Sequence, residues 1–139
     1  MNSSNKDYLS TSVTGYKRRT HKKGDQILKD GDFGEEMFVI AKGKVQVSKV
    51  IDGNRVNLGE LERGEFFGEM SLLEGLPRSA DVYASSDTEL LVISSGGLLL
   101  KIRRDPTFAL EMLRVLSGRL RKTTNFLEDS IKDSHESSS

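Results

Sequence analysis

The chain has 139 residues, which suits one domain with a modest hydrophobic core. Its 21 Lys and Arg balance its 21 Asp and Glu, so no net charge draws the whole molecule to nucleic acid or to an acidic membrane. The absence of Cys excludes disulfides and thiolate metal sites, and His21 and His135 lie far apart in sequence, which argues against a histidine metal centre. No apolar run is long enough for a signal peptide or a membrane span, so we expect a cytoplasmic protein without a membrane segment.

Polar segments flank the central part of the chain. Residues 1–14 are rich in Ser, Thr and Asn and lack hydrophobic periodicity, so we expect a loose polar leader. Residues 131–139 are expected to form a frayed polar tail. A single domain is therefore predicted over residues 15–130.

Residues 16–94 carry the signals of β-strands. In the stretch MFVIAKGKVQVSKV, apolar and polar residues alternate around Val45 and Val47, and Gly43 interrupts the run. Asp52-Gly53 lies between two strand-like runs, which favours a β-hairpin, and TELLVIS, residues 88–94, is predicted to be a buried last strand. Short strands recur about every ten residues, a spacing typical of a barrel or a sandwich, jelly rolls included.

The periodicity becomes helical after Ser94. GGLLLKIRR predicts a short helix, and Asp105-Pro106 favours the start of a long helix, which we expect over residues 105–130. That helix carries a row of residues at alternating spacings of three and four, a heptad pattern that indicates a partner helix. A single broad stripe that faces the core of the domain would explain the same periodicity. The residues of this seam are Leu113, Leu116, Leu120, Thr123 and Leu127.

The stretch FGEMSLLEGLPRSADV contains the first candidate binding residues. If the apolar turn after Gly68 is helical, its free backbone N–H groups form a small anion site. Glu69 at the start of such a turn is favoured by the helix dipole, and its carboxylate can accept a hydrogen bond from a sugar hydroxyl.

The end of the same stretch can bind a phosphate. Arg78 has a planar fork that can hold two phosphate oxygens at once, and Ser79 adds a hydroxyl donor. The small Ala80 keeps the floor of the site narrow. Together these residues suit a phosphate and a ribose that are held side by side. The alternative is a structural ion pair between Glu69 and Arg78.

This stretch is similar to the phosphate-binding cassette of cyclic-nucleotide-binding domains, which occur in bacterial catabolite-activator-like regulators, in regulatory subunits of cyclic-nucleotide-dependent kinases and in gated channels. The family pattern is F-G-E, an aliphatic and a small residue, L and an aliphatic, a short loop and then P-R-(small)-A, and FGEMSLLEGLPRSA contains every element. KDGDFGEEMFVIAKGKVQV also looks like the family's early strands. The resemblance covers residues 16–127. It implies a mainly β fold with flanking helices: an eight-stranded β-roll, also called a double-stranded β-helix or jelly roll, and a long C-terminal helix.

The resemblance implies a role for each matching residue. Glu69 would accept a hydrogen bond from the ribose 2′-hydroxyl, and Arg78 and Ser79 would bind the exocyclic phosphate oxygens. In the catabolite-activator branch, hydroxyl residues near the middle of the long helix meet the purine, one from each subunit, and Thr123 and Thr124 fall at those places. An Arg of that branch corresponds to an Arg here as well. The implied ligand-binding residues are Gly68, Glu69, Met70, Arg78, Ser79, Ala80, Arg119, Thr123 and Thr124.

Four features depart from the family pattern. The short helix after Ser94 begins with Gly96-Gly97, where an aromatic residue is common. The loop between Leu73 and Arg78 is one residue shorter than in the catabolite activator and closer in length to that of kinase subunits. Asp81 stands where many members have Thr, Asn or an aromatic residue, and we expect this acidic group either to repel the anion or to face solvent. The chain ends after the long helix, so we expect no DNA-reading helix-turn-helix domain and no DNA binding by this chain alone.

We therefore predict a sensor domain that binds a cyclic nucleotide, cAMP rather than cGMP, and that signals through its C-terminal helix to the other subunit of a homodimer or to a protein effector. No cofactor, metal or catalytic activity is expected, because the chain lacks the His ligands of a cupin-like enzyme, a G-x-x-x-x-G-K-[ST] loop and a nucleophile elbow. Two alternatives stay open. One is a structural dimerisation module with a degenerate pocket, and the other is the sensor half of a transcription regulator that lacks its helix-turn-helix.

Overall fold

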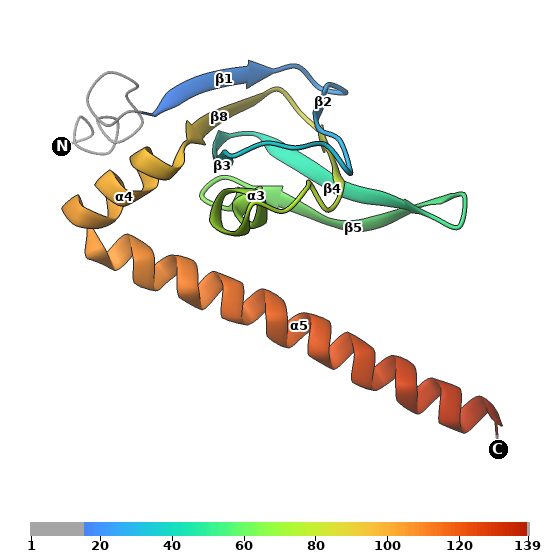
Figure 1. The fold of residues 1–139 in the computed structure, drawn as a ribbon. Helices are drawn as coiled ribbons and strands as arrows, with labels where there is room; N and C mark the ends of the chain where they lie inside the picture. Colours follow the sequence, from blue (N-terminus) through green and yellow to red (C-terminus); the bar gives the residue numbers. More distant parts are fainter. Residues whose placement is uncertain (1–15, 139) are drawn as a thin grey trace. The chain divides into compact units, whose positions relative to one another are not determined.

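The computed structural model describes residues 16–138, with the side chains of residues 134–138 excepted (Figure 1). Contacts divide the chain into a part that ends at Leu100 and a part that begins at Lys101. None of the described helices is both long and apolar enough to cross a membrane. The polar leader predicted over residues 1–14 lies outside the described residues.

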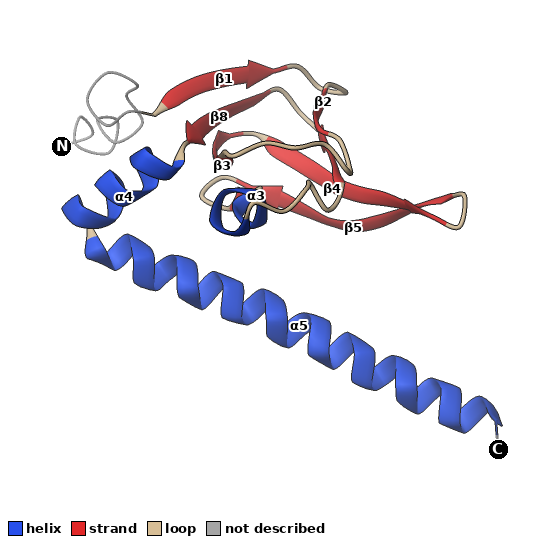
Figure 2. Ribbon diagram, in the orientation of Figure 1, coloured by secondary structure: helices blue, strands red, loops and turns tan. Residues whose placement is uncertain are grey.

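In the described part of the chain, eight strands form two antiparallel sheets of four strands each. They are red in Figure 2. The order is β1-β8-β3-β6 in the first sheet and β2-β7-β4-β5 in the second. These two sheets, together with the long helix that follows them in sequence, confirm the predicted β-roll. The strands are β1 (Lys17–His21), β2 (Gln26–Leu28), β3 (Met37–Lys42), β4 (Lys44–Ile51), β5 (Asn54–Glu62), β6 (Phe66–Phe67), β7 (Asp81–Ala84) and β8 (Thr88–Ile93).

The hydrophobic core lies between the two sheets, because buried side chains from both of them form one cluster. Phe38 on β3 and Phe67 on β6 stack at its centre, with ring centroids 5.2 Å apart. β8 lies between β1 and β3 and is buried along most of its length, which confirms the predicted buried last strand. The cluster consists of Phe38, Ile40, Val45, Phe67, Val82, Leu90 and Val92.

The β4–β5 hairpin turns at Asp52-Gly53, as the sequence predicts. Ile51 pairs with Asn54, so two residues make the turn. Their φ angles are 52° at Asp52 and 80° at Gly53, the two positive values that a type I′ turn requires. Asp and Gly adopt this left-handed conformation more easily than other residues, and this explains how the local sequence sets the register of the hairpin.

The described residues form three helices. A short one lies between β6 and β7, and two follow β8 in the chain. The first of these two is the short helix predicted after Ser94. The helices are α3 (Glu69–Glu74), α4 (Ser95–Arg104) and α5 (Pro106–Ser138).

α5 is longer than the sequence analysis predicts. It begins at Pro106, in agreement with the expected start, but it continues to Ser138. The predicted end at residue 130 is therefore wrong, and so is the frayed tail for residues 131–138. No Gly or Pro follows Gly118 in the sequence, so the polar residues at the end of the chain include no residue that breaks a helix.

Gly43, which joins β3 to β4, provides a test of the turn geometry. Its φ is 91°, and an added Cβ would lie 2.7 Å from Thr88 Oγ1 and 2.9 Å from Thr88 Cα. We expect Gly43→Ala to lower the free energy of unfolding by roughly 2–5 kcal/mol, because backbone strain and steric overlap add. Gly53→Ala is the matched control, since φ there is 80° and a Cβ meets nothing within 4 Å. Strain alone should cost it about 1–2 kcal/mol. Urea unfolding measures both values, and equal losses would contradict the expected overlap.

Candidate functional site

Gly68 and the first turn of α3 open the segment that the sequence identified as a binding site. The segment after Gly68 is helical, as predicted, and Gly68 itself has a φ of 82° in the left-handed region. A Cβ on Gly68 would lie 3.0 Å from Arg78 Nη1 and 3.2 Å from the carbonyl oxygen of Glu36. Glycine therefore permits the turn and also lets the Arg78 guanidinium approach the main chain.

The Arg78 side chain is buried at the centre of this segment. Only 6 % of the residue's surface is exposed. Its Nη1 donates hydrogen bonds to the carbonyl oxygens of Glu36, at 2.8 Å, and of Gly68, at 3.2 Å. Its Cζ lies 5.6 Å from the centroid of the Phe38 ring, within the range of a cation–π contact. The guanidinium is thus fixed between β3 and the start of α3.

The surroundings of Arg78 compensate its charge only in part. Burial is the largest influence on the pKa of Arg78 and lowers it, the Glu36 carboxyl opposes this, and the Arg19 guanidinium adds to the lowering. An arginine nevertheless stays charged at neutral pH. An anion beside this guanidinium would oppose the effect of burial and stabilise the charged form.

The other predicted residues of the cassette lie around the same segment. Glu69 is buried in the first turn of α3, and Met70 beside it is exposed. Ser79 follows Arg78 directly and is exposed, whereas Ala80 is buried. The fold therefore presents an exposed hydroxyl next to a buried guanidinium.

The predicted residues on the long helix belong to the second part of the structure. The Thr123 hydroxyl donates to the carbonyl oxygen of Arg119, at 3.1 Å, and the Thr124 hydroxyl donates to that of Leu120, at 3.0 Å. Each hydroxyl thus uses its only hydrogen within its own helix, and its oxygen keeps lone pairs that can accept.

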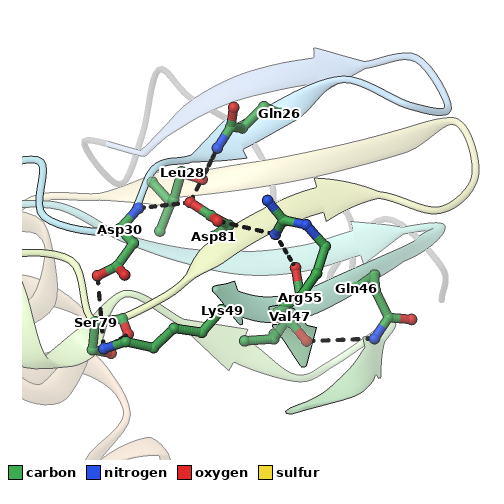
Figure 3. A network of polar contacts seen from close by, with 10 residues as sticks. Gln26, Leu28, Asp30, Gln46, Val47, Lys49, Arg55, Ser79 and Asp81 are labelled. Atoms are coloured by element: carbon green, nitrogen blue, oxygen red, sulfur yellow. Dashed lines mark hydrogen bonds and ion pairs between the residues drawn. The ribbon is translucent and has the colours of Figure 1, made fainter. Parts of the chain in front are cut away.

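Asp81 differs from the expectation that its carboxylate faces solvent. It is buried, with 7 % of its surface exposed, and its Oδ1 accepts hydrogen bonds from the Asp30 N–H, at 2.8 Å, and from Gln26 Nε2, at 3.2 Å (Figure 3). Its Oδ2 lies 3.0 Å from Arg55 Nη1, an ion pair. The prediction of a solvent-facing group is therefore wrong, because three donors that the sequence did not reveal converge on this carboxylate.

Comparison with known proteins agrees with this geometry. The family profile described as the cyclic nucleotide-binding domain matches residues 18–105. The chain belongs to this family. The matched region includes both sheets from Arg18 onward, α3 and the whole segment around Arg78.

Bacterial regulators and kinase subunits are among the relatives of this cyclic nucleotide-binding domain. The Cyclic AMP receptor protein of Thermus thermophilus is 39% identical over 115 residues, which cover 82% of this chain and 53% of that protein. A cAMP-dependent protein kinase regulatory subunit of Debaryomyces hansenii is 40% identical over 91 residues, 66% of this chain and 18% of the subunit. The crystal structure of Thermus thermophilus Catabolite Activator Protein superposes with a TM-score of 0.76 at 35% identity, over 88% of this chain and 58% of that one. The chain thus spans about half the length of the bacterial relatives.

The residues that hold Arg78 in place in this cyclic nucleotide-binding domain could not be predicted from the sequence. Arg78 N donates to the carbonyl oxygen of Asp32, at 2.7 Å, and its own carbonyl accepts from Gly31 N, at 2.8 Å. These contacts and the acceptor at Glu36 are main-chain groups, which any residue type can supply, so no sequence pattern indicates them. The glycines of KDGDFGEEMF were the only available signal.

The pKa of Asp81 predicts a pH dependence of stability. The Asp30 N–H is the largest of the influences that lower this pKa, and the Arg55 guanidinium adds to it. Because the folded pKa lies below the unfolded value of about 3.9, the stabilisation is fully present above that pH and is lost as the pH falls through the folded pKa. Asp81→Asn should therefore cost roughly 1–3 kcal/mol at pH 7 and progressively less as the pH falls through the folded pKa. Urea unfolding over a series of acidic pH values tests this.

Glu89→Gln is the control for that measurement. Glu89 lies on β8, in the sheet that does not contain Asp81, and is partly exposed, with its Oε2 3.9 Å from Nη2 of Arg18 on β1. Its loss should change the free energy of unfolding by less than about 1 kcal/mol at pH 7. A difference between Asp81→Asn and the wild type that stays constant with pH would show that the charge of Asp81 does not stabilise the fold.

Proposed function

We propose that this chain is a sensor that binds a cyclic mononucleotide at α3 and the start of β7, and that cAMP is its preferred ligand. The observation that carries the proposal is the buried Arg78 guanidinium, which main-chain carbonyls hold in place beside the first turn of α3. A cyclic phosphate would supply one negative charge and two exocyclic oxygens, which match the fork of an arginine. The family relationship supports the same ligand class.

The remaining cassette residues would bind the rest of the phosphate and the sugar. The exposed Ser79 hydroxyl would donate to a phosphate oxygen, and the backbone N–H groups near Gly68 and Met70 would add further donors. Glu69 would accept a hydrogen bond from the ribose 2′-hydroxyl, and the small Ala80 would leave room for the ring phosphate. A ligand that lacks either the phosphate or the free 2′-hydroxyl would leave some of these hydrogen-bonding groups without a partner.

The preference for adenine follows from the hydroxyl groups on α5. Thr123 and Thr124 already donate to carbonyls of their own helix, so each can act toward a base mainly as an acceptor. The edge of adenine presents an amino group, a donor, at the position where guanine presents a carbonyl oxygen, an acceptor. An acceptor on the protein therefore suits adenine. Arg119, one turn before Thr123, is proposed as a further contact of the ligand.

The long helix would carry the signal. Leu113, Leu120 and Leu127 on α5 each have more than half of their surface exposed, and they recur every seven residues. We assign them to the seam of a homodimer. Binding would favour one arrangement of α5 over another, since a ligand shifts an equilibrium by its difference in affinity for the two states. A cytoplasmic location, a protein effector and the lack of catalytic activity complete the proposal.

Replacement of Arg78 tests the phosphate contact. Arg78→Ala should weaken cAMP binding by about 2–5 kcal/mol, because the desolvated phosphate loses its charge partner. Arg63→Ala is the matched control: it removes an exposed arginine from the turn before β6 and should leave the affinity unchanged. Isothermal titration calorimetry gives both affinities, and circular dichroism verifies the fold. An Arg78→Ala protein that binds cAMP like the wild type would refute the assigned site.

Replacement of Thr123 tests the base contact. Thr123→Ala should weaken cAMP binding about fivefold through the loss of one hydrogen-bond acceptor, while cGMP binding should change less. The measured quantity is the ratio of the two affinities. Asn125→Ala, on the side of α5 away from the seam, should leave that ratio as it is. An unchanged ratio in Thr123→Ala would remove the helix from the account of base selectivity.

Replacement of Leu120 tests the homodimer. Leu120→Glu would place like charges opposite each other in the seam, and we expect the dimer dissociation constant to rise at least about tenfold. Asn125→Glu introduces the same charge outside the seam and should leave the dimer intact. Analytical ultracentrifugation distinguishes the two results. A wild-type chain that stays monomeric with and without cAMP would contradict the dimer.

A further inference from the structure

Asp81 lies at the start of β7, just after Arg78 and Ser79, and uses both carboxylate oxygens (Figure 3). Oδ1 accepts from the Asp30 N–H, at 2.8 Å, and from Gln26 Nε2, at 3.2 Å. Oδ2 accepts from Arg55 Nη1, at 3.0 Å. The side chain thus joins β7 to the end of β2 and to the β4–β5 hairpin.

The loop that hydrogen-bonds to Asp81 also hydrogen-bonds to Arg78. Residues 29–36 connect β2 to β3 and belong to no strand. Directly after Asp30, Gly31 N donates to the Arg78 carbonyl, at 2.8 Å, and the Asp32 carbonyl accepts from Arg78 N, at 2.7 Å. The last residue of the loop, Glu36, provides the carbonyl that accepts from the guanidinium. The position of the Arg78 side chain therefore depends on where this loop runs.

The hairpin side of the network reinforces the same segment. Arg55 Nη1 also donates to Ser48 Oγ, at 2.8 Å, so the guanidinium that pairs with Asp81 is itself fixed. Lys49 Nζ on β4 donates to the Ser79 carbonyl, at 3.2 Å, and lies 3.8 Å from Asp30 Oδ1. One cation of the hairpin, Lys49, thus contacts both the loop and the residue next to Arg78, and the other, Arg55, pairs with Asp81.

We propose that Asp81 is the positioning residue of the phosphate site: its carboxylate fixes the 29–36 loop, and the loop fixes the guanidinium of Arg78. This inference rests on the proposed function, since it assumes that Arg78 binds a phosphate. A carboxylate suits the role because it accepts three hydrogen bonds at once and balances the charge of Arg55. A hydroxyl or an aromatic residue at this position could not make the same three contacts.

The test compares cAMP affinities of variants by isothermal titration calorimetry. Asp81→Ala should weaken binding about tenfold or more, because the loop loses its anchor. Asp81→Asn keeps an oxygen for the Asp30 N–H and should recover most of that loss. Glu89→Ala, which removes a carboxylate from the other sheet, is the matched control and should bind like the wild type.

A double-mutant cycle separates positioning from general destabilisation. If Asp81 acts through Arg78, Asp81→Ala should weaken cAMP binding much less in an Arg78→Lys protein than in the wild type, because the guanidinium that it positions is gone. Full additivity of the two losses would overturn the inference. If Asp81→Ala fails to fold, amide hydrogen exchange of the wild-type protein provides the test. Saturating cAMP should slow the exchange of the Asp30, Gly31 and Arg78 amides together. An unchanged exchange rate at Asp30 would overturn the inference.

The possible failures can be told apart. A wild-type protein that binds no cyclic nucleotide refutes the proposed function, and the positioning role falls with it. A wild-type protein that binds cAMP, with an Asp81→Ala variant of equal affinity, refutes the positioning role alone.

Discussion

The burial of one cation, the Arg78 guanidinium, is the constraint on which the rest of the site depends. A buried guanidinium is costly unless its N–H groups find acceptors and its charge finds a partner. Here the known acceptors are the carbonyls of Glu36, directly before β3, and of Gly68, directly after β6. Both must approach the side chain closely, which explains a glycine with a φ of 82° at position 68. The two packed sheets hold these segments together, so the core around Phe38 and Phe67 also sets the geometry of the site.

The same constraint connects the fold to the proposed function. The Arg78 guanidinium is buried, and a charge interaction is stronger away from water, so an anion bound beside it would gain more than beside a solvated arginine. Asp81 contributes to the same site indirectly. Its charge is balanced by Arg55, and it fixes the loop that carries the Glu36 acceptor. Two charged groups close together in sequence thus have separate partners and separate tasks.

The sequence predicted those features that depend on side-chain type and spacing. The Asp52-Gly53 turn, the buried β8, the helical turn after Gly68 and the start of α5 at Pro106 all follow from local preferences. The predicted end of α5 is wrong, because a polar composition does not end a helix where no Gly or Pro breaks it. The predicted environment of Asp81 is also wrong, because its partners Asp30 and Arg55 come from other strands and loops. Main-chain acceptors such as the Glu36 carbonyl cannot be predicted from a sequence pattern, because every residue type carries a carbonyl.

The most direct test of cyclic-nucleotide binding is isothermal titration calorimetry of the wild-type chain with cAMP, cGMP and a cyclic dinucleotide. The protein is first unfolded and refolded to remove any bound ligand. We predict saturable binding of cAMP at micromolar concentrations or below, weaker binding of cGMP, and none of the dinucleotide. If none of the three binds to a well-folded protein, the chain is not a cyclic-nucleotide sensor. The buried guanidinium of Arg78 would then be a structural group of a module that has lost its ligand.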